Sequence, residues 1–296
     1  MSTYVILDVG TNNVLMLWAT KENGEITTIR RESAISAMGK GMHDARLTNE
    51  AIETTKCILK DNIKRSLKFS KNIIIAGTSS SREAKNINEI SDWARSEFGL
   101  KYNIISGECE AELNGLANIQ EFKSLEDFVL FDVGGGSTEF TFIQNGKIEF
   151  TKTLKLGIRR LHNMFDNFEQ RKQFTRTILE HIPKFQSTSL VGIGGTATSL
   201  AAIKNKLKKY DAKVVHRSKI TASELNEIFT NLETLSPIEI SKLMMFDVKR
   251  SDIILTGTMV VSEIIRFFGV QNFYISDKGL QYGILNLPEE EIEKML

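Results

Sequence analysis

Two turns of the chain combine an aspartate with glycines and short polar side chains. Asp8 leads into Val-Gly-Thr-Asn-Asn, and Asp132 leads into Val-Gly-Gly-Gly-Ser-Thr-Glu. Glycine allows positive φ and lets a ligand approach the backbone, so successive N–H groups can form an anion-binding nest. We therefore predict phosphate contacts at Gly10, Thr11, Asn12 and Asn13 in the first turn and at Gly134, Gly135, Gly136, Ser137 and Thr138 in the second.

A third glycine-containing segment follows another apolar run and consists of Gly194 and Gly195, with Thr196 after them. The alternative interpretation is that all these segments are plain turns between elements of secondary structure. One such turn would not decide between the two interpretations. Because the pattern recurs, we favour phosphate binding and add these three residues to the predicted site.

The elements around the turns form a repeat. The two aspartates are 124 positions apart, and each copy reads as strand, glycine turn, strand, tight turn and strand. Helices alternating with strands follow each copy, which is the α/β pattern. The repeat predicts two domains, residues 1–124 and 125–296, with the last helix (about 288–296) packing back on the first domain.

Periodicity and turn signals give the individual elements. Strands are predicted at residues 4–7, 14–20, 25–33, 72–76, 102–105, 128–131, 139–144, 147–154, 189–193 and 272–276. Helices are predicted at residues 49–68, 82–98, 108–119, 157–165, 168–183, 197–207, 222–232, 237–244, 251–268 and from 279 onward.

Composition and charge narrow the class of protein. The 296 residues carry a formal net charge of +1, so no basic excess points to nucleic acid. The two cysteines have no metal or redox spacing, and no apolar run reaches the roughly 18–20 residues of a membrane helix. No leader segment is recognisable at the N-terminus. We expect a cytoplasmic protein that does not bind a membrane.

Several motifs together resemble the exopolyphosphatase and guanosine pentaphosphate phosphohydrolase family in its short, two-domain form. The resemblance runs from residue 4 to about 285 and implies two actin-like (ribonuclease H-like) α/β domains with an interdomain cleft. It rests on Asp8-Val-Gly-Thr-Asn-Asn, Gly77-Thr78 with Arg82, Ser106-Gly-Glu-Cys-Glu-Ala111, Asp132-Val-Gly-Gly-Gly-Ser-Thr-Glu139, Gly192-Ile-Gly-Gly-Thr196, Arg250-Ser-Asp252 and Ser276-Asp-Lys-Gly-Leu280.

The resemblance assigns roles to individual residues. It implies that Glu110 activates the attacking water and that Arg82 binds phosphate. Asp132 and Glu139 match carboxylates associated with a divalent metal ion, Mg²⁺ or another. Asp8 is the counterpart of Asp132 in the first copy and is expected to hold a water bound to that metal. Oxygen ligands of this kind suit Mg²⁺. Without the resemblance, Glu110 would read as a solvated residue in the first turn of a helix.

The chain departs from the family at three positions where arginine is usual. These positions hold Ala37, Glu112 and Gln281. Because arginine–phosphate contacts are charge-assisted hydrogen bonds, each loss predicts weaker binding of a polyanion. We expect the chemistry to be retained and shorter substrates to be preferred.

The function predicted is Mg²⁺-dependent hydrolysis of phosphoanhydride bonds in inorganic polyphosphate, guanosine pentaphosphate or both, a reaction of the stringent response. A preference for short polyphosphate or for nucleoside di- and triphosphates is one alternative. A non-catalytic nucleotide or alarmone sensor and a small-molecule kinase of the same superfamily are the others. A homodimer is compatible with the sequence, although no residue pattern requires it.

Overall fold

The computed structural model describes residues 1–183, 185 and 189–296, which form two compact units. Unit 1 comprises residues 1–113 and 280–296, and unit 2 comprises residues 114–279. The division therefore differs from the predicted boundary between residues 124 and 125. The chain passes between units inside helix α4 (Gly107–Asn118) and again before helix α12 (Leu280–Asn286).

The C-terminal segment belongs to unit 1 because its side chains are bonded there. The amide of Gln281 donates to the carbonyl of Ile6 at 3.3 Å, and the hydroxyls of Tyr282 and Thr28 are 2.8 Å apart. Tyr4 donates a hydrogen bond to Glu289, which begins helix α13 (Glu289–Met295). Contacts made by side chains far apart in the sequence therefore place these two helices.

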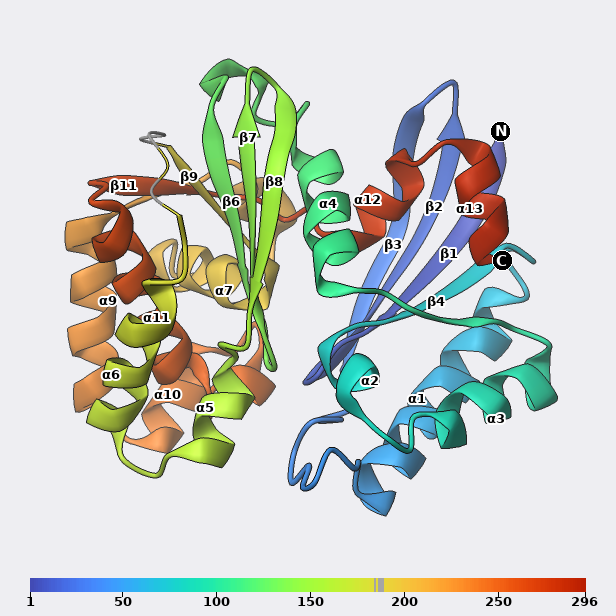
Figure 1. Cartoon of the computed structure of the whole chain (residues 1–296), viewed down its shortest axis with the longest axis horizontal. Helices are drawn as coiled ribbons and strands as arrows, with labels where there is room; N and C mark the ends of the chain where they lie inside the picture. Colours follow the sequence, from blue (N-terminus) through green and yellow to red (C-terminus); the bar gives the residue numbers. More distant parts are fainter. Residues whose placement is uncertain (184, 186–188) are drawn as a thin grey trace. The chain divides into compact units, whose positions relative to one another are not determined.

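Unit 1 is built on a five-stranded sheet with the order β3-β2-β1-β4-β5 (Figure 1). Strands β1, β2 and β3 pair antiparallel, whereas β4 and β5 run parallel to β1. The strands are β1 (Ser2–Val9), β2 (Asn13–Glu22), β3 (Glu25–Ile35), β4 (Ile73–Gly77) and β5 (Tyr102–Ile104). The remaining helices of this unit are α1 (Asn49–Ser66), α2 (Ser79–Glu83) and α3 (Asn88–Phe98).

Unit 2 has a six-stranded sheet with the order β10-β11-β9-β6-β7-β8. Its strands are β6 (Phe128–Val133), β7 (Thr138–Gln144), β8 (Lys147–Leu154), β9 (Leu190–Ile193), β10 (Lys219–Thr221) and β11 (Asn272–Ile275). Its helices are α5 (Ile158–Met164), α6 (Phe168–Leu179), α7 (Gly194–Lys204), α8 (Ala212–Val215), α9 (Ala222–Thr234), α10 (Pro237–Leu243) and α11 (Ile254–Phe268), with 3₁₀ turns η1 (Lys123–Leu125) and η2 (Val248–Arg250).

The predicted repeat is confirmed by the strand order. Strands β8-β7-β6-β9-β11 of unit 2 follow the same path as β3-β2-β1-β4-β5 of unit 1, with the same parallel and antiparallel pairs. The added edge strand β10 and the short helix α8 were not predicted, because three- and four-residue elements are too short to show a period. Both glycine turns therefore lie at equivalent places, between the first two strands of each unit.

Local signals explain several helix ends. Thr221 and Ser236 form capping boxes at the starts of α9 and α10, and Gly269 ends α11 with a φ of 67°. The predicted helix over residues 82–98 is wrong as one element. It is divided into α2 and α3 because the chain turns to an extended conformation at Ala84, where φ is −76° and ψ is 117°.

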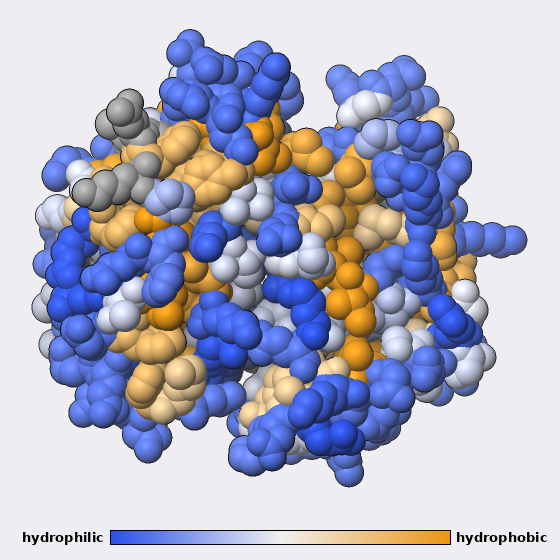
Figure 2. Space-filling view, viewed as in Figure 1, coloured by the Kyte–Doolittle hydropathy of each residue, from blue (hydrophilic) through white to orange (hydrophobic). Residues whose placement is uncertain are grey.

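Each unit buries its own apolar core against its sheet. In unit 1 the core includes β1 residues such as Val5 and Leu7, and in unit 2 it includes Phe131 and Phe140 of β6 and β7. Hydrophilic residues cover most of the face seen in Figure 2. Over the described ranges, none of the helices has both the length and the apolar sequence that crossing a membrane requires.

An ion cluster in unit 2 yields a prediction about stability. Glu121 accepts from His216 at 3.0 Å and from Arg217 at 2.9 Å, and it also pairs with Lys278. Burial acts to raise the pKa of Glu121, but the bonds to Lys278 and His216 outweigh it and lower the pKa to about 2. A depressed carboxyl pKa stabilises the folded state above the unfolded pKa, and this contribution is lost as the pH falls toward 2.

We therefore expect Glu121→Gln to lower the free energy of unfolding at pH 7 by about 1–3 kcal/mol, allowing for partial solvent screening. Urea unfolding at pH 7 and in steps below pH 4.5 measures this difference between wild type and variant. The difference should shrink across the acid range, and a constant difference would contradict the assignment.

Candidate active site

The glycine turn of unit 2 is held from one side by the start of α5. The N–H groups of Ile158 and Arg159 donate to the carbonyls of Gly134 and Gly135 at 3.0 and 2.8 Å. The Nε of Arg160 donates to the carbonyl of Gly136 at 2.7 Å. All three glycine carbonyls of the turn are thus directed toward α5.

The opposite side of the turn presents N–H groups. In a trans peptide the N–H points away from the carbonyl of the same unit, so the N–H groups of Gly135, Gly136 and Ser137 face away from α5. Within the described part of the chain, the N–H groups of Gly135 and Gly136 make no hydrogen bond to other protein groups. Such a row of donors can bind the oxygens of a phosphate group.

Gly157 sets the distance between the turn and α5, and the sequence analysis did not identify it. A Cβ atom at this position would lie 2.3 Å from the carbonyl carbon of Gly136 and 2.5 Å from the carbonyl oxygen of Gly135. Both contacts are with backbone, which cannot move aside as a flexible side chain could. Only glycine therefore permits this packing.

Asp132 and Glu139 lie directly opposite each other in the antiparallel register of β6 and β7. Opposite residues place their side chains on the same face of a sheet, so the two carboxylates are neighbours. Glu139 is buried, and the carboxylate of Asp132 lies against Gly194, where an added Cβ would be 2.1 Å from Oδ1. Two neighbouring carboxylates fit Mg²⁺, which is commonly held by one or two protein carboxylates plus water and phosphate.

Gly194, Gly195 and Thr196 form the first turn of α7 rather than a separate turn before it. Gly194 has a φ of 75°, a conformation that glycine adopts readily and that lets the helix begin directly after β9. The guanidinium of Arg250 lies against Gly195, since a Cβ there would be 2.0 Å from Arg250 Cζ. Asp247 accepts from Arg250 Nε at 2.8 Å and fixes this position.

The hydroxyls of Thr138 and Thr196 have internal partners. Thr138 donates to the carbonyl of Leu156, and Thr196 donates to the carbonyl of Val133 at 3.0 Å. Both threonines are almost fully buried. Their hydroxyls hold the turn in shape, and a phosphate contact at either residue stays a prediction.

The glycine turn of unit 1 is braced by a neighbouring loop and by α2. Gly10 donates to the carbonyl of Asn13 at 2.8 Å, and Ala37 donates to the carbonyl of Asn12 at 2.9 Å. Ser80 Oγ donates to Thr11 Oγ1 at 3.0 Å. The turn and the serine run before Arg82 are thus in direct contact.

Arg82 and Glu110 form an ion pair in unit 1. Arg82 Nη1 is 2.6 Å from Glu110 Oε2 and also donates to the carbonyl of Ile105 at 2.8 Å. Their side chains are 18% and 12% exposed, so each group is mostly covered yet can be reached by solvent. Burial raises the pKa of the Glu110 carboxyl, and the Arg82 guanidinium opposes that rise.

Three further residues of unit 1 were singled out from the sequence, namely Asp8, Glu112 and Gln281. Asp8 lies in β1 beside Ala76 of β4, and therefore in a different unit from Asp132 and Glu139. Glu112 is exposed on α4, two residues beyond Glu110. Gln281 is 5% exposed, and its amide is bonded to β1. Its side chain is therefore used inside unit 1, and the absence of arginine at this position is weak support for reduced phosphate binding.

Unit 2 also contains basic side chains at the turns that the sequence analysis did not assign to the site. Arg159 and Arg160 lie in the first turn of α5, and Arg250 of η2 lies against Gly195 in α7. The run Gly157-Ile-Arg-Arg after a strand could have signalled a phosphate site, because it places two arginines next to a glycine. Their closeness to the Gly134–Gly136 turn, however, arises from tertiary contacts that no spacing reveals.

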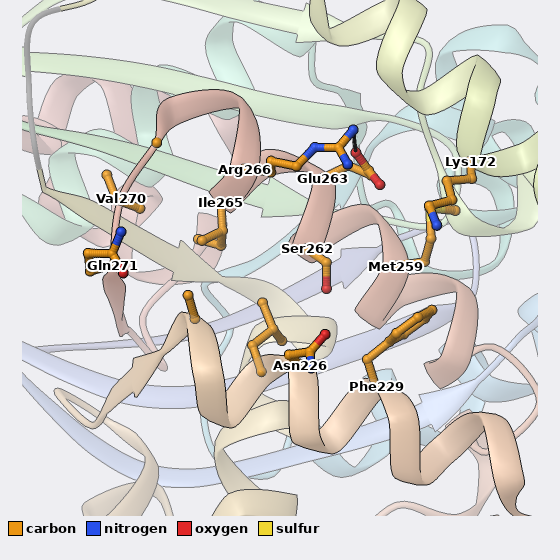
Figure 3. A pocket seen from close by; sticks show the side chains of 13 residues that line it. Lys172, Asn226, Phe229, Met259, Ser262, Glu263, Ile265, Arg266, Val270 and Gln271 are labelled. Atoms are coloured by element: carbon orange, nitrogen blue, oxygen red, sulfur yellow. Dashed lines mark ion pairs between the residues drawn. The ribbon is translucent and has the colours of Figure 1, made fainter.

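A groove of about 430 Å³ lies elsewhere in unit 2, between α6, α9 and α11 (Figure 3). Its lining includes Phe229, Met259 and Glu263, and the carboxylate of Glu263 pairs with Arg266 at 2.8 Å. None of the predicted site residues lines it. Across the residues described, no group of three or more His, Cys, Asp and Glu side chains could hold a metal ion.

Comparison with known proteins agrees with this geometry. The chain is 32% identical over 304 residues to a bifunctional 3-dehydroquinate synthase/phosphatase of Fusobacterium nucleatum, covering 94% of this chain but only 45% of that protein. It is 26% identical to exopolyphosphatase 2 of Mycobacterium tuberculosis, covering 94% of this chain and 96% of that protein.

A solved structure of the Aquifex aeolicus member of the Ppx/GppA protein family is 27% identical, with a TM-score of 0.82 over 99% of this chain and 98% of that one. The prediction of two actin-like α/β domains is thereby confirmed. Residues 18–289 match the Ppx/GppA phosphatase family, and the chain therefore belongs to that family.

Proposed function

We propose that this protein hydrolyses the phosphoanhydride bonds of inorganic polyphosphate or guanosine pentaphosphate, with Glu110 as the base that activates water. The observation that carries the proposal is the Arg82–Glu110 pair, in which a mostly buried carboxylate lies 2.6 Å from a guanidinium. A base needs a pKa near the working pH, and burial moves the pKa of a carboxyl in that direction. The guanidinium can bind a phosphoryl oxygen beside the water.

The turn of unit 2 supplies the phosphate-binding groups in this proposal. The N–H groups of Gly135, Gly136 and Ser137 would bind phosphate oxygens, and Arg250 adds positive charge beside the first turn of α7. Hydrolysis of a phosphoanhydride depends mainly on positioning and on neutralising the charge of the transferred group. Fixed N–H donors and guanidinium groups provide both.

Asp132 and Glu139 would hold the metal ion, Mg²⁺ or another divalent cation. When bound, the ion would neutralise charge on the phosphate oxygens. Asp8 was predicted to assist from the first copy of the repeat, and it stays a candidate for holding a metal-bound water. Because β6 and β7 fix the spacing of the two carboxylates, these side chains would set the position of the ion.

The Arg82–Glu110 pair predicts how activity depends on pH. Replacing Arg82 with Gln removes the cation that lowers the Glu110 pKa, so this pKa should rise further. Because the base must be deprotonated, the acidic limb of kcat/KM should move to higher pH. A pH profile of phosphate release from both proteins measures the shift, and an unmoved acidic limb would argue against Glu110 as the base.

The proposed function is tested by phosphate release in the presence of Mg²⁺. Long polyphosphate, tripolyphosphate, guanosine pentaphosphate and simple nucleoside di- and triphosphates are compared at equal phosphate concentration. Release from the first three supports the proposal. Binding of guanosine pentaphosphate without any release would favour the sensor, and transfer of phosphate to a sugar would favour the kinase.

A preference for short substrates is the second candidate. It is favoured by Glu112, which places an exposed carboxylate where the family usually has arginine, because a carboxylate repels a polyanion. The comparison of long polyphosphate with tripolyphosphate distinguishes the two. A lower KM for the long chain would exclude this preference.

A further inference from the structure

Two arginines begin α5, and both are bonded to the glycine turn of unit 2. The N–H groups of Arg159 and Arg160 converge on the carbonyl of Gly135 at 2.8 and 3.1 Å. The side chain of Arg160 is fixed by its bond to Gly136. The side chain of Arg159 instead extends to a carboxylate, with Nη1 2.7 Å from Asp252 Oδ2.

The two partners of this pair differ in their exposure to solvent. The Arg159 side chain is 14% exposed, whereas that of Asp252 is 54% exposed. A half-exposed carboxylate can be rehydrated at little cost when it leaves, but a covered guanidinium requires another anion in its place. Asp252 can therefore leave the pair easily, whereas Arg159 needs another anion when it does.

Asp252 also belongs to the short segment that places Arg250. That segment includes η2 (Val248–Arg250), sets the guanidinium of Arg250 against Gly195 and then brings Asp252 to Arg159. One segment thus contacts both the first turn of α7 and the start of α5. It therefore fixes two guanidinium groups, that of Arg250 against Gly195 and that of Arg159, whose own N–H is bonded to the glycine turn.

We propose that Arg159 is a substrate-binding residue whose guanidinium is occupied by Asp252 in the free protein and by a phosphate group of the substrate in the complex. The inference rests on the proposed function and specifies the substrate-binding set of the same site. A substrate phosphate with more than one negative charge replaces the single charge of Asp252. Ligands of low charge do not replace it, so the pair selects for polyanionic phosphates.

This exchange predicts opposite effects for its two partners. Arg159→Gln should weaken binding of tripolyphosphate about tenfold to a hundredfold, because a charge-assisted hydrogen bond is lost. Asp252→Asn should strengthen binding roughly two- to fivefold, since the competing charge is removed. Arg159→Lys should lie between Arg159→Gln and wild type, because lysine keeps the charge but not the planar fork.

The experiment measures the dissociation constant of tripolyphosphate by calorimetry, together with kcat and KM for its hydrolysis, in these variants and in the double variant. Arg266→Gln is the matched control, because Arg266 pairs with a carboxylate on α11 and lies outside the glycine turns. Its binding constant should equal that of wild type. The double variant should bind like Arg159→Gln, since Asp252 has nothing to compete for once Arg159 is gone.

A purely structural ion pair would give a different pattern. Both single variants would then weaken binding and lower the melting temperature in the same direction, and that outcome overturns the inference. The result is independent of turnover, because calorimetry reports binding alone. Opposite effects on binding in a protein that releases no phosphate would support Arg159 and refute the proposed hydrolysis.

Discussion

Glu110→Gln is expected to lower kcat for phosphate release by a factor of about 10²–10⁴, the usual contribution of a positioned general base. Glutamine has nearly the same shape and can still accept from Arg82, so the local packing is preserved. It cannot take a proton from water at neutral pH. We therefore expect KM to change little and the melting temperature to stay close to that of wild type.

The control for this variant is Glu112→Gln on the same helix. Glu112 is exposed and two positions away, so its replacement removes the same charge from α4 without touching the Arg82 pair. It should retain full kcat. If Glu110→Gln kept more than a tenth of the wild-type kcat, another group would have to activate the water.

Gly157→Ala is expected to reduce both phosphate binding and stability. The new Cβ would lie 2.3–2.5 Å from backbone atoms of Gly135 and Gly136, so either the turn or α5 must move. Overpacking of this kind costs about 1–3 kcal/mol of folding free energy. A displacement of the turn by about 1 Å can reduce the rate by roughly a hundredfold, because the N–H donors lose alignment with phosphate.

Gly283→Ala separates the two effects of that substitution. Its Cβ would lie 2.0 Å from the carbonyl oxygen of Leu113, a comparable clash between α12 and α4 within unit 1. Thermal unfolding and tripolyphosphate binding are measured for both variants. Gly283→Ala should lose stability but bind tripolyphosphate normally while folded, and equal binding by Gly157→Ala would show that Gly157 serves packing alone.

The sequence alone determined the repeated strand order and the position of both glycine turns. Asp-Val-Gly after an apolar run and the Asn145-Gly146 hairpin are local signals, and they require no knowledge of distant contacts. The opposition of Asp132 and Glu139 also follows from a short hairpin, because six residues separate them across one tight turn. These features depend only on residues that are close together in the sequence, so the sequence alone predicts them.

The tertiary structure decided which side chains meet. Arg82 and Glu110 are 28 positions apart, and their contact depends on how α2 follows β4 and α4 follows β5. Residues 280–296 belong to unit 1 because they bond to β1 and β3, 250 or more positions earlier. The use of Thr138 and Thr196 as internal donors likewise depends on carbonyls from other segments. Such pairings form only once apolar faces are buried, so no pattern along the chain contains them.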